Sequence, residues 1–183
     1  MEKSVIVAGF GGQGVMVIGQ LLGYTAAETT DKRVTYFPSY GAEQRGGTAN
    51  CYVVISDDEV GAPKVSQADY LIILNQPSVE KFKNNLAPGG TVFTNSSIVT
   101  DTSVFPEGTK IIPVPAGDIA TELGSSKVMN LIMIGALIGY TGMLPEENVL
   151  QTAYNKLGKK RPQLNPLNKA AFERGLAIGK AHL

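Results

Sequence analysis

Residues 4–15, with the sequence SVIVAGFGGQGV, decide the fold that we predict for this chain. Residues 4–8 form a short apolar run rich in β-branched side chains, which is typical of a strand. After Gly14 the apolar side chains recur at the spacing of one helical face. These side chains are Val15, Ile18, Leu21 and Leu22. The glycines between the two patterns therefore form a turn that leads from a strand into a helix.

The glycine turn has the spacing G-x-G-x-x-G at Gly9, Gly11 and Gly14. This spacing allows a tight turn and a close approach of the backbone to a phosphate. The free N–H groups at the start of the helix would then face an anion. A dinucleotide site usually adds an acidic residue about 20 positions later to bind a ribose hydroxyl, but Asp31 precedes the second predicted strand and Glu43 lies well beyond it. The turn could therefore hold a dinucleotide, another anion or a neighbouring protein surface.

A second motif, SYGAEQRGGTAN at residues 39–50, follows the predicted strand at residues 33–37. The carboxyl ends of the strands of a parallel sheet face its ligand crevice, so this loop is well placed to contact a ligand. Arg45 offers a planar set of donors for a carboxylate or a phosphate, and Gly46 and Gly47 allow a close approach of the backbone. We interpret the loop as functional rather than as an ordinary surface loop with an exposed arginine.

Apolar runs and amphipathic segments alternate along the rest of the chain. Further strands are predicted over residues 50–56, over residues 70–75, after the turn APGG at residues 87–90, and at an edge with two prolines over residues 110–116. A short helix over residues 76–86 would turn Val79, Phe82 and Leu86 inward. From Ala116 onward the pattern is helical, with segments at residues 117–124, 128–140, 144–158 and 165–181.

This order of elements predicts an α/β protein with a Rossmann-like fold. Strands that alternate with helices indicate right-handed crossovers and a mostly parallel sheet covered by helices on both faces. The last third of the chain adds a helical C-terminal part. A length of 183 residues suffices for one core and is too short for us to expect two, so we predict a single domain over residues 1–183.

The charge and the apolar segments exclude several classes of protein. The formal net charge is zero, which argues against a nucleic-acid partner. Residues 1–10 lack the pattern of a secretory signal, so we expect a cytoplasmic protein with no membrane partner. The most apolar segment, residues 128–144, contains Asn130 and several glycines, and its length favours a buried core helix over a membrane span.

Cysteine and histidine are scarce, with Cys51 and His182 the only examples of each. Iron–sulfur clusters usually need four thiolates and zinc sites need several Cys, His or carboxylate ligands, so we expect neither on this chain alone. A catalytic triad is likewise not expected, because His182 is the penultimate residue. Cys51 occupies an apolar position in a predicted strand, where we expect it to be buried as a small hydrophobic residue.

Four segments together resemble the gamma subunit of 2-oxoacid:ferredoxin oxidoreductases, the family that acts on pyruvate, 2-oxoglutarate and 2-oxoisovalerate. The segments are AGFGGQGV at residues 8–15, SYGAEQRGGTANCYVVIS at residues 39–56, APGGTVFTNSS at residues 87–97 and NKAAFERG at residues 168–175. The resemblance runs over essentially the whole chain. The pair GGQG and RGG, in this order and at this separation, is more specific than either glycine pattern alone.

The resemblance implies a Rossmann-like subunit of an enzyme that converts a 2-oxoacid and coenzyme A into acyl-CoA and carbon dioxide and passes electrons to ferredoxin. It also implies partner subunits, alpha, beta and delta, of which some carry thiamine diphosphate and iron–sulfur clusters. Coenzyme A would enter at the edge of this subunit, and the isolated chain would not be catalytic. The residues that we expect at this entrance are Gly11, Gly12, Gln13, Gly14, Tyr40, Arg45, Gly46 and Gly47.

Two other functions are compatible with the sequence. A stand-alone oxidoreductase could use the glycine turn for a dinucleotide, although the acidic residue is missing. Alternatively, the subunit could be purely structural, with both glycine motifs serving close protein packing and binding no ligand. The sequence also leaves open which 2-oxoacid is used, because that choice would be made around the thiamine on other chains.

Overall fold

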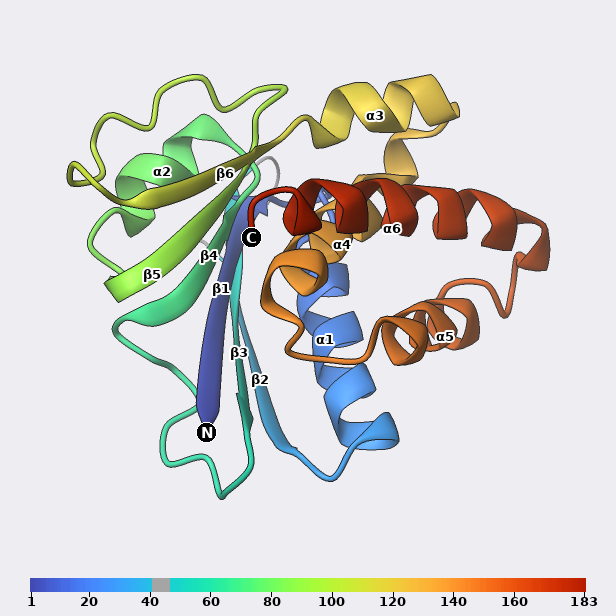
Figure 1. Ribbon diagram of the computed structural model, residues 1–183, viewed down its shortest axis with the longest axis horizontal. Coiled ribbons are helices and arrows are strands. Elements are labelled where there is room, and N and C mark those ends of the chain that lie inside the picture. Colours follow the sequence, from blue (N-terminus) through green and yellow to red (C-terminus); the bar gives the residue numbers. More distant parts are fainter. Residues whose placement is uncertain (41–46) are drawn as a thin grey trace.

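The computed structural model describes residues 1–40 and 47–183 and contains a six-stranded sheet with helices on both sides (Figure 1). The order of the strands across the sheet is β2-β3-β1-β4-β5-β6. Their bounds are β1 Glu2–Phe10, β2 Arg33–Tyr40, β3 Thr48–Ser56, β4 Ala68–Ile73, β5 Leu86–Asn95 and β6 Lys110–Val114.

The sheet is mostly parallel, as predicted, with β3 as the exception. Strands β1, β4, β5 and β6 pair in parallel, whereas β3 pairs antiparallel with both β1 and β2. Residues 41–47 join β2 to β3, and a connection this short cannot make the crossover that a parallel pair needs. Strand β2 therefore runs in the same direction as β1, and the carboxyl ends of both strands lie at one edge of the sheet.

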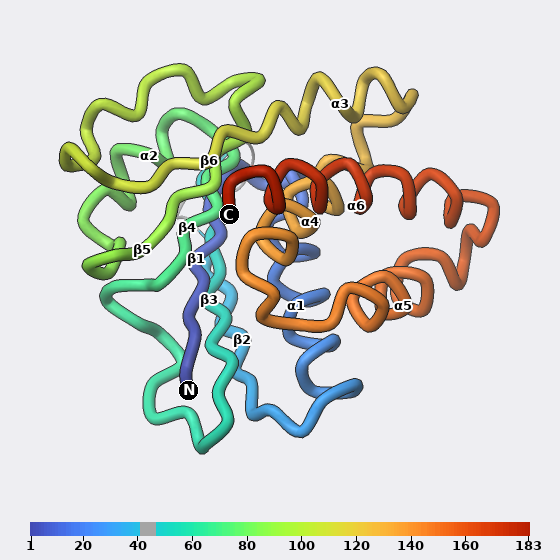
Figure 2. Tube along the Cα trace, in the orientation of Figure 1, coloured from blue at the N-terminus to red at the C-terminus, as the bar shows by residue number. Residues whose placement is uncertain are grey.

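The helices cover the two faces of the sheet unequally (Figures 1 and 2). Helix α2 and the loop of residues 96–109 lie on one face, where Val79, Phe82, Val99 and Phe105 are buried. All the other helices lie on the opposite face. Their bounds are α1 Val15–Thr29, α2 Gln76–Phe82, α3 Ala116–Leu123, α4 Met129–Thr141, α5 Glu146–Lys156 and α6 Asn165–Lys180.

Both faces of the central strand β1 are buried. Val5 and Val7 belong to the core under α1 and α4, whereas Ile6 and Ala8 belong to the core under α2, and all four side chains are fully buried. This division follows from the alternation of side chains along a strand. It also explains why strands at the centre of the sheet read as continuous apolar runs.

Helix α4 is the core helix that the sequence predicts. Its residues 131–139 are all buried, and it packs against α6 through glycines. A Cβ atom added to Gly135 would lie 2.4 Å from the carbonyl oxygen of Phe172, and one added to Gly175 would lie 2.1 Å from that of Ile132. In the described part of the chain, no helix is both long enough and apolar enough to cross a membrane.

Two sequence expectations are wrong in detail. Leu86 does not lie on the inner face of α2, because that helix ends at Phe82 and Leu86 begins β5. The segment at residues 87–90 is not a turn before the strand but part of it, opposite an irregularity in β4 between Ala68 and Tyr70. The expected edge position of β6 is confirmed, with Pro113 next to Thr94 of β5.

Candidate functional site

The glycine turn joins β1 to α1 at the carboxyl edge of the sheet. Gly12 and Gly14 have φ angles of 90° and 86°, a left-handed conformation that glycine adopts without strain. Gly14 is also the residue that precedes α1, and no side chain of the described residues caps the start of this helix. A Cβ added to Gly14 would lie 3.2 Å from Cβ of Asn130 at the start of α4. The turn is thus shaped by its backbone and by its contact with a second helix.

The side chain of Gln13 forms hydrogen bonds that hold the turn in place. Its Oε1 accepts hydrogen bonds from the backbone N–H of Phe10 at 2.6 Å and from Nδ2 of Asn75 at 3.2 Å. Its Nε2 donates to the carbonyl oxygen of Leu74 at 3.4 Å. Because Leu74 and Asn75 follow β4, Gln13 fastens the turn to the neighbouring strand.

The glycine turn and the second motif meet through their backbones. The N–H of Gly11 donates to the carbonyl oxygen of Gly47 at 3.0 Å, and Gly47 is buried just before β3. Tyr40, at the end of β2, is 74% exposed. Arg45 and Gly46 lie outside the described residues. The sequence motifs that are distant in the chain thus come together at one edge of the sheet.

A pocket of about 280 Å³ lies between the start of α1 and the end of β2. Of the predicted site residues, Gly11, Gly12, Gly14 and Tyr40 line it. The other lining residues are Phe10, Val15, Met16, Val17 and Ala49. Gln13 is not among the lining residues, in keeping with the bonds that turn it towards β4.

The pocket combines an apolar wall with the positive end of a helix. The first turn of α1 contains no acidic side chain, so no residue of this turn offsets the partial positive charge of the helix start. Backbone N–H groups in such a position favour phosphate or carboxylate groups. The described lining therefore suits a ligand with an anionic group next to an apolar or aromatic part.

The order of the strands explains why the acid of a dinucleotide site is missing. In that kind of site the acidic residue ends the strand next to β1 and reaches the ribose. Here β3 lies between β1 and β2, so the end of β2 is two strand spacings from β1, or about 10 Å. The strand that does neighbour β1 on this side is β3, which presents its first residues at this edge.

Asn75 and Asn130 support the turn, and the sequence interpretation overlooked both. Asn75 is buried, and its Oδ1 accepts from the N–H of Ser78 at 2.9 Å at the start of α2. The pattern Asn-Gln-Pro-Ser at residues 75–78 is typical of a helix start and was the signal for this role. Asn130 stands in an apolar run, where its Oδ1 accepts a hydrogen bond from the N–H of Leu131 at 2.7 Å and its Cβ lies close to Gly14.

Cys51 is fully buried beneath α1, as expected. Its Sγ lies 3.5 Å from the carbonyl oxygen of Val15 and would lie 2.5 Å from a Cβ added to Gly19. Burial raises the pKa of its thiol to about 12. The thiol therefore stays protonated and packs as an apolar group, which makes it a poor nucleophile or metal ligand.

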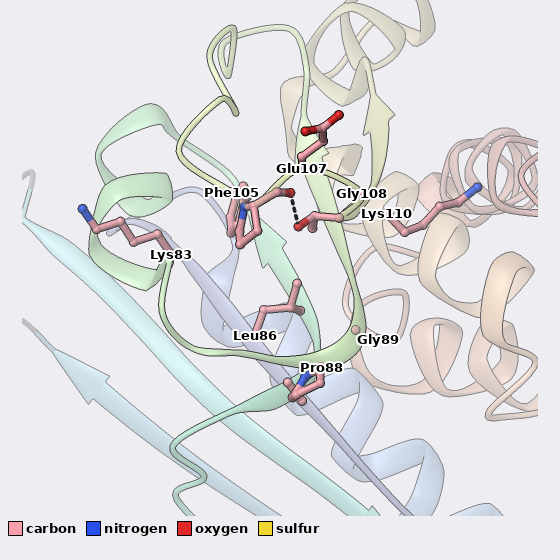
Figure 3. Close-up of a pocket in the computed structure, with 12 residues that line it drawn as sticks. Lys83, Leu86, Pro88, Gly89, Phe105, Glu107, Gly108 and Lys110 are labelled. Carbon is pink, nitrogen blue, oxygen red and sulfur yellow. Dashed lines mark hydrogen bonds between the residues drawn. The ribbon is translucent and has the colours of Figure 1, made fainter.

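A larger hollow of about 440 Å³ lies at the opposite edge of the sheet, between the start of β5 and the end of the 96–109 loop. Three charged side chains stand around it, and Figure 3 shows that Lys83, Glu107 and Lys110 all point away from its centre. Lys83 pairs with Glu80. Because its charges are directed elsewhere, this hollow is a weaker candidate than the glycine-turn pocket. Among the described residues, no group of three or more His, Cys, Asp or Glu side chains could hold a metal ion.

The sequence profile of the family described as pyruvate ferredoxin/flavodoxin oxidoreductase matches residues 4–178. This chain belongs to that family. Subunit KorC of 2-oxoglutarate synthase from Methanocaldococcus jannaschii is 32% identical over 181 residues, which cover 98% of this chain and 95% of KorC.

A second relative shows that the family also occurs within longer chains. Ketoisovalerate oxidoreductase subunit VorA from Methanothermobacter thermautotrophicus is 37% identical over 163 residues, which cover 87% of this chain and 33% of VorA. The chain thus spans only about a third of the length of this relative.

Two solved structures share the fold over their matched parts. The gamma subunit of a keto/oxoacid ferredoxin oxidoreductase from Geobacter sulfurreducens has a TM-score of 0.86 and 26% identity, and the match covers 100% of this chain and 98% of that subunit. The 2-oxoglutarate:ferredoxin oxidoreductase from Magnetococcus marinus, with 2-oxoglutarate, coenzyme A and succinyl-CoA bound, has a TM-score of 0.88 and 26% identity, covering 98% of this chain and 31% of that one.

Proposed function

We propose that this chain is the gamma component of a multisubunit 2-oxoacid:ferredoxin oxidoreductase. Family membership over residues 4–178 and the nearly full-length match to KorC support this function. In this proposal the alpha, beta and delta components and ferredoxin are its partners in the cytoplasm. Thiamine diphosphate and the iron–sulfur clusters are held by those other components.

The complex would decarboxylate and oxidise the 2-oxoacid. The bond between the carboxyl carbon and the carbonyl carbon of the 2-oxoacid breaks and releases carbon dioxide. The sulfur of coenzyme A forms a new bond to the remaining acyl carbon, the thiol proton is released, and two electrons leave for ferredoxin. In this proposal the role of this chain is to bind and orient coenzyme A. The substrate is a 2-oxoacid whose side chain is recognised on other components.

The hydrogen bond from Gly11 to Gly47 is the observation that carries the proposed coenzyme A entrance. It brings the two motifs of the sequence to one pocket at the start of α1. The helix start favours a phosphate of coenzyme A, and the apolar lining favours its pantetheine arm. In this proposal Gly12, Gly14 and Tyr40 border the entrance, Gln13 positions the turn, and Arg45 and Gly46 extend the entrance from the 41–46 segment.

Replacing Arg45 tests the entrance in the assembled complex. In the Arg45→Ala variant we expect the KM for coenzyme A to rise roughly 10- to 100-fold, because a charge-assisted contact to phosphate is worth about 1.5–3 kcal/mol. The KM for the 2-oxoacid should stay unchanged. The matched control is Arg161→Ala, which removes an exposed arginine from the loop before α6 and should alter neither constant.

Gel filtration of both variant complexes shows whether each complex is fully assembled. An unchanged KM for coenzyme A in a fully assembled Arg45→Ala complex would contradict the phosphate contact. A complex that fails to assemble would show instead that Arg45 contacts another subunit.

A further inference from the structure

A groove of about 250 Å³ lies between α1 and β2, on the face of the sheet that carries most of the helices (Figures 1 and 2). It runs along one side of α1, from the middle of the helix towards its end. These lining residues are different from those of the glycine-turn pocket. They are Gln20, Gly23, Tyr24 and Ala27 from the helix and Val34 and Tyr36 from the strand.

Packing does not explain why position 23 is a glycine. A glycine inside a helix lowers the stability of the helix relative to alanine. At Gly19, one turn earlier, an added Cβ would lie 2.5 Å from Sγ of Cys51, so close packing excludes a side chain there. At Gly23 the nearest atom would be 3.9 Å away, on Tyr36. A side chain at position 23 would fill the groove itself, so Gly23 keeps the groove open at a cost to the helix, which is typical of functional sites.

Tyr24 gives the groove an aromatic wall that is held in place. Its side chain is 43% exposed, and Nζ of Lys156 lies 4.1 Å from the centre of its ring. Lys156 in turn pairs with Glu28 at 2.9 Å. An exposed ring with a fixed orientation is a surface on which a second flat ring can stack.

Gln20 supplies a polar group at the rim of the groove. Its side chain is exposed, and its amide offers both an acceptor and two donors. The edge of an adenine ring presents a donor at N6 and an acceptor at N7, a pair that a glutamine amide can bind. The groove therefore suits a flat heterocycle that carries donors and acceptors at its edge, and a purine has both.

The groove adjoins the glycine-turn pocket. Met16 lines that pocket, Tyr36 lines the groove, and the hydroxyl of Tyr36 donates to Sδ of Met16 at 3.3 Å. Because an α-helix rises 1.5 Å per residue, Gln20 and Gly23 lie about 9–14 Å along α1 from Gly14. This separation is comparable with the distance between the diphosphate and the purine of an extended nucleoside diphosphate. One ligand can therefore hold its phosphates at the helix start and its ring in the groove.

We propose that this groove binds the adenine ring of coenzyme A while the start of α1 binds its diphosphate. This inference rests on the proposed function, which brings coenzyme A to the glycine turn. The adenine ring stacks on Tyr24, and its edge faces the amide of Gln20. The pantetheine arm extends from the turn in the other direction, so the thiol reaches the other subunits while this chain holds the adenosine half.

Steady-state kinetics of the assembled complex with two thiol substrates test the groove. Coenzyme A contains the adenosine half, whereas 4′-phosphopantetheine has the same thiol, the same pantetheine arm and one phosphate but no adenosine. The side chain of the Gly23→Leu variant fills the groove. We expect this variant to raise the KM for coenzyme A about 10- to 100-fold, because stacking on an aromatic side chain strengthens binding of a base by about this factor. The KM for 4′-phosphopantetheine should stay unchanged.

Tyr24→Ala removes the stacking surface without filling the groove, and we expect it to change the two KM values in the same pattern. Each variant has a matched control that should alter neither KM. Gly61→Leu makes the first change in an exposed loop, where no described atom lies within 4 Å of an added Cβ. Phe37→Ala removes an aromatic side chain of 40% exposure from the other face of β2. Equal rises of both KM values in the groove variants, or no rise in either, would overturn the proposal.

Calorimetry with 3′-phosphoadenosine 5′-diphosphate, the adenosine half of coenzyme A, separates this inference from the proposed function. The unaltered complex should bind this nucleotide, and the Gly23→Leu complex should bind it at least about tenfold more weakly. A complex that binds it in this way but forms no acyl thioester would contradict the proposed function and still support the groove as an adenine site. No binding to the unaltered complex, or equal binding to both, would overturn the groove assignment. Groove variants that fail to assemble would also overturn it, because another subunit would then cover the groove.

Discussion

Gln13 lies in the middle of the motif that defines the family resemblance, and its contacts are internal. It holds the N–H of Phe10, the amide of Asn75 and the carbonyl of Leu74. A residue with these bonds determines where the glycine backbone lies, so we expect Gln13 to influence a bound ligand through the position of the turn. The sequence marks Gln13 as a site residue but cannot show this role, because Leu74 and Asn75 are about sixty positions away in the chain.

Gln13→Ala should destabilise the folded chain by about 1–3 kcal/mol, because it leaves the N–H of Phe10 and the amide of Asn75 without an acceptor in a partly buried turn. Urea unfolding followed by circular dichroism measures this difference. Gln151→Ala is the control, since Gln151 is exposed and its side chain donates to Asn155 on its own helix. Equal losses of stability in the two variants would contradict the role of Gln13 in the turn.

At the scale of elements, the contact of α4 with α6 depends on the absence of side chains. Gly135 and Gly139 on α4 face Gly175 and Gly179 on α6, and a Cβ at any of these positions would lie within 2.4 Å of a backbone oxygen of the other helix. The two backbones therefore approach more closely than ordinary side chains allow. This contact fixes α4, and with it Asn130 above the glycine turn.

Gly175→Ala should cost at least about 1–3 kcal/mol of stability, since the added methyl group would force α4 and α6 apart. Thermal or urea unfolding of the purified chain provides the measurement. Gly23→Ala on α1 makes the same chemical change where the nearest atom is 3.9 Å away, and it should be neutral or stabilising by up to about 1 kcal/mol. If Gly175→Ala were as stable as this control, the close packing would be disproved.

Patterns within single segments predicted most elements correctly. The helical spacing after Gly14 and the apolar run that became α4 are local signals, and both helices begin within a residue of the predicted position. The antiparallel direction of β3 could also have been predicted from the sequence, because the connection of residues 41–47 is short. The position of Leu86 in β5 could not have been predicted in this way, because it depends on the pairing of Leu86 with Ala68 of β4.

At the scale of the whole molecule, the strand directions gather both sequence motifs at one edge. Strands β1 and β2 end at this edge and β3 begins there, so the Gly11 to Gly47 bond closes the gap between the motifs. The opposite edge carries the hollow of Figure 3, with its charges directed outward. The sequence could predict the glycine-turn edge as the candidate site because the carboxyl ends of parallel strands share one edge.

The described part of the chain offers a candidate binding edge and a buried, protonated cysteine, so we expect the redox chemistry to take place on other chains. The most direct test is an anaerobic pull-down of the tagged chain from its native cell extract, followed by mass spectrometry and an absorbance spectrum. We predict brown partner subunits with iron–sulfur absorbance and thiamine diphosphate. A colourless chain that is recovered without partner subunits, or one that retains a nicotinamide or a flavin, would contradict the assignment as a gamma component.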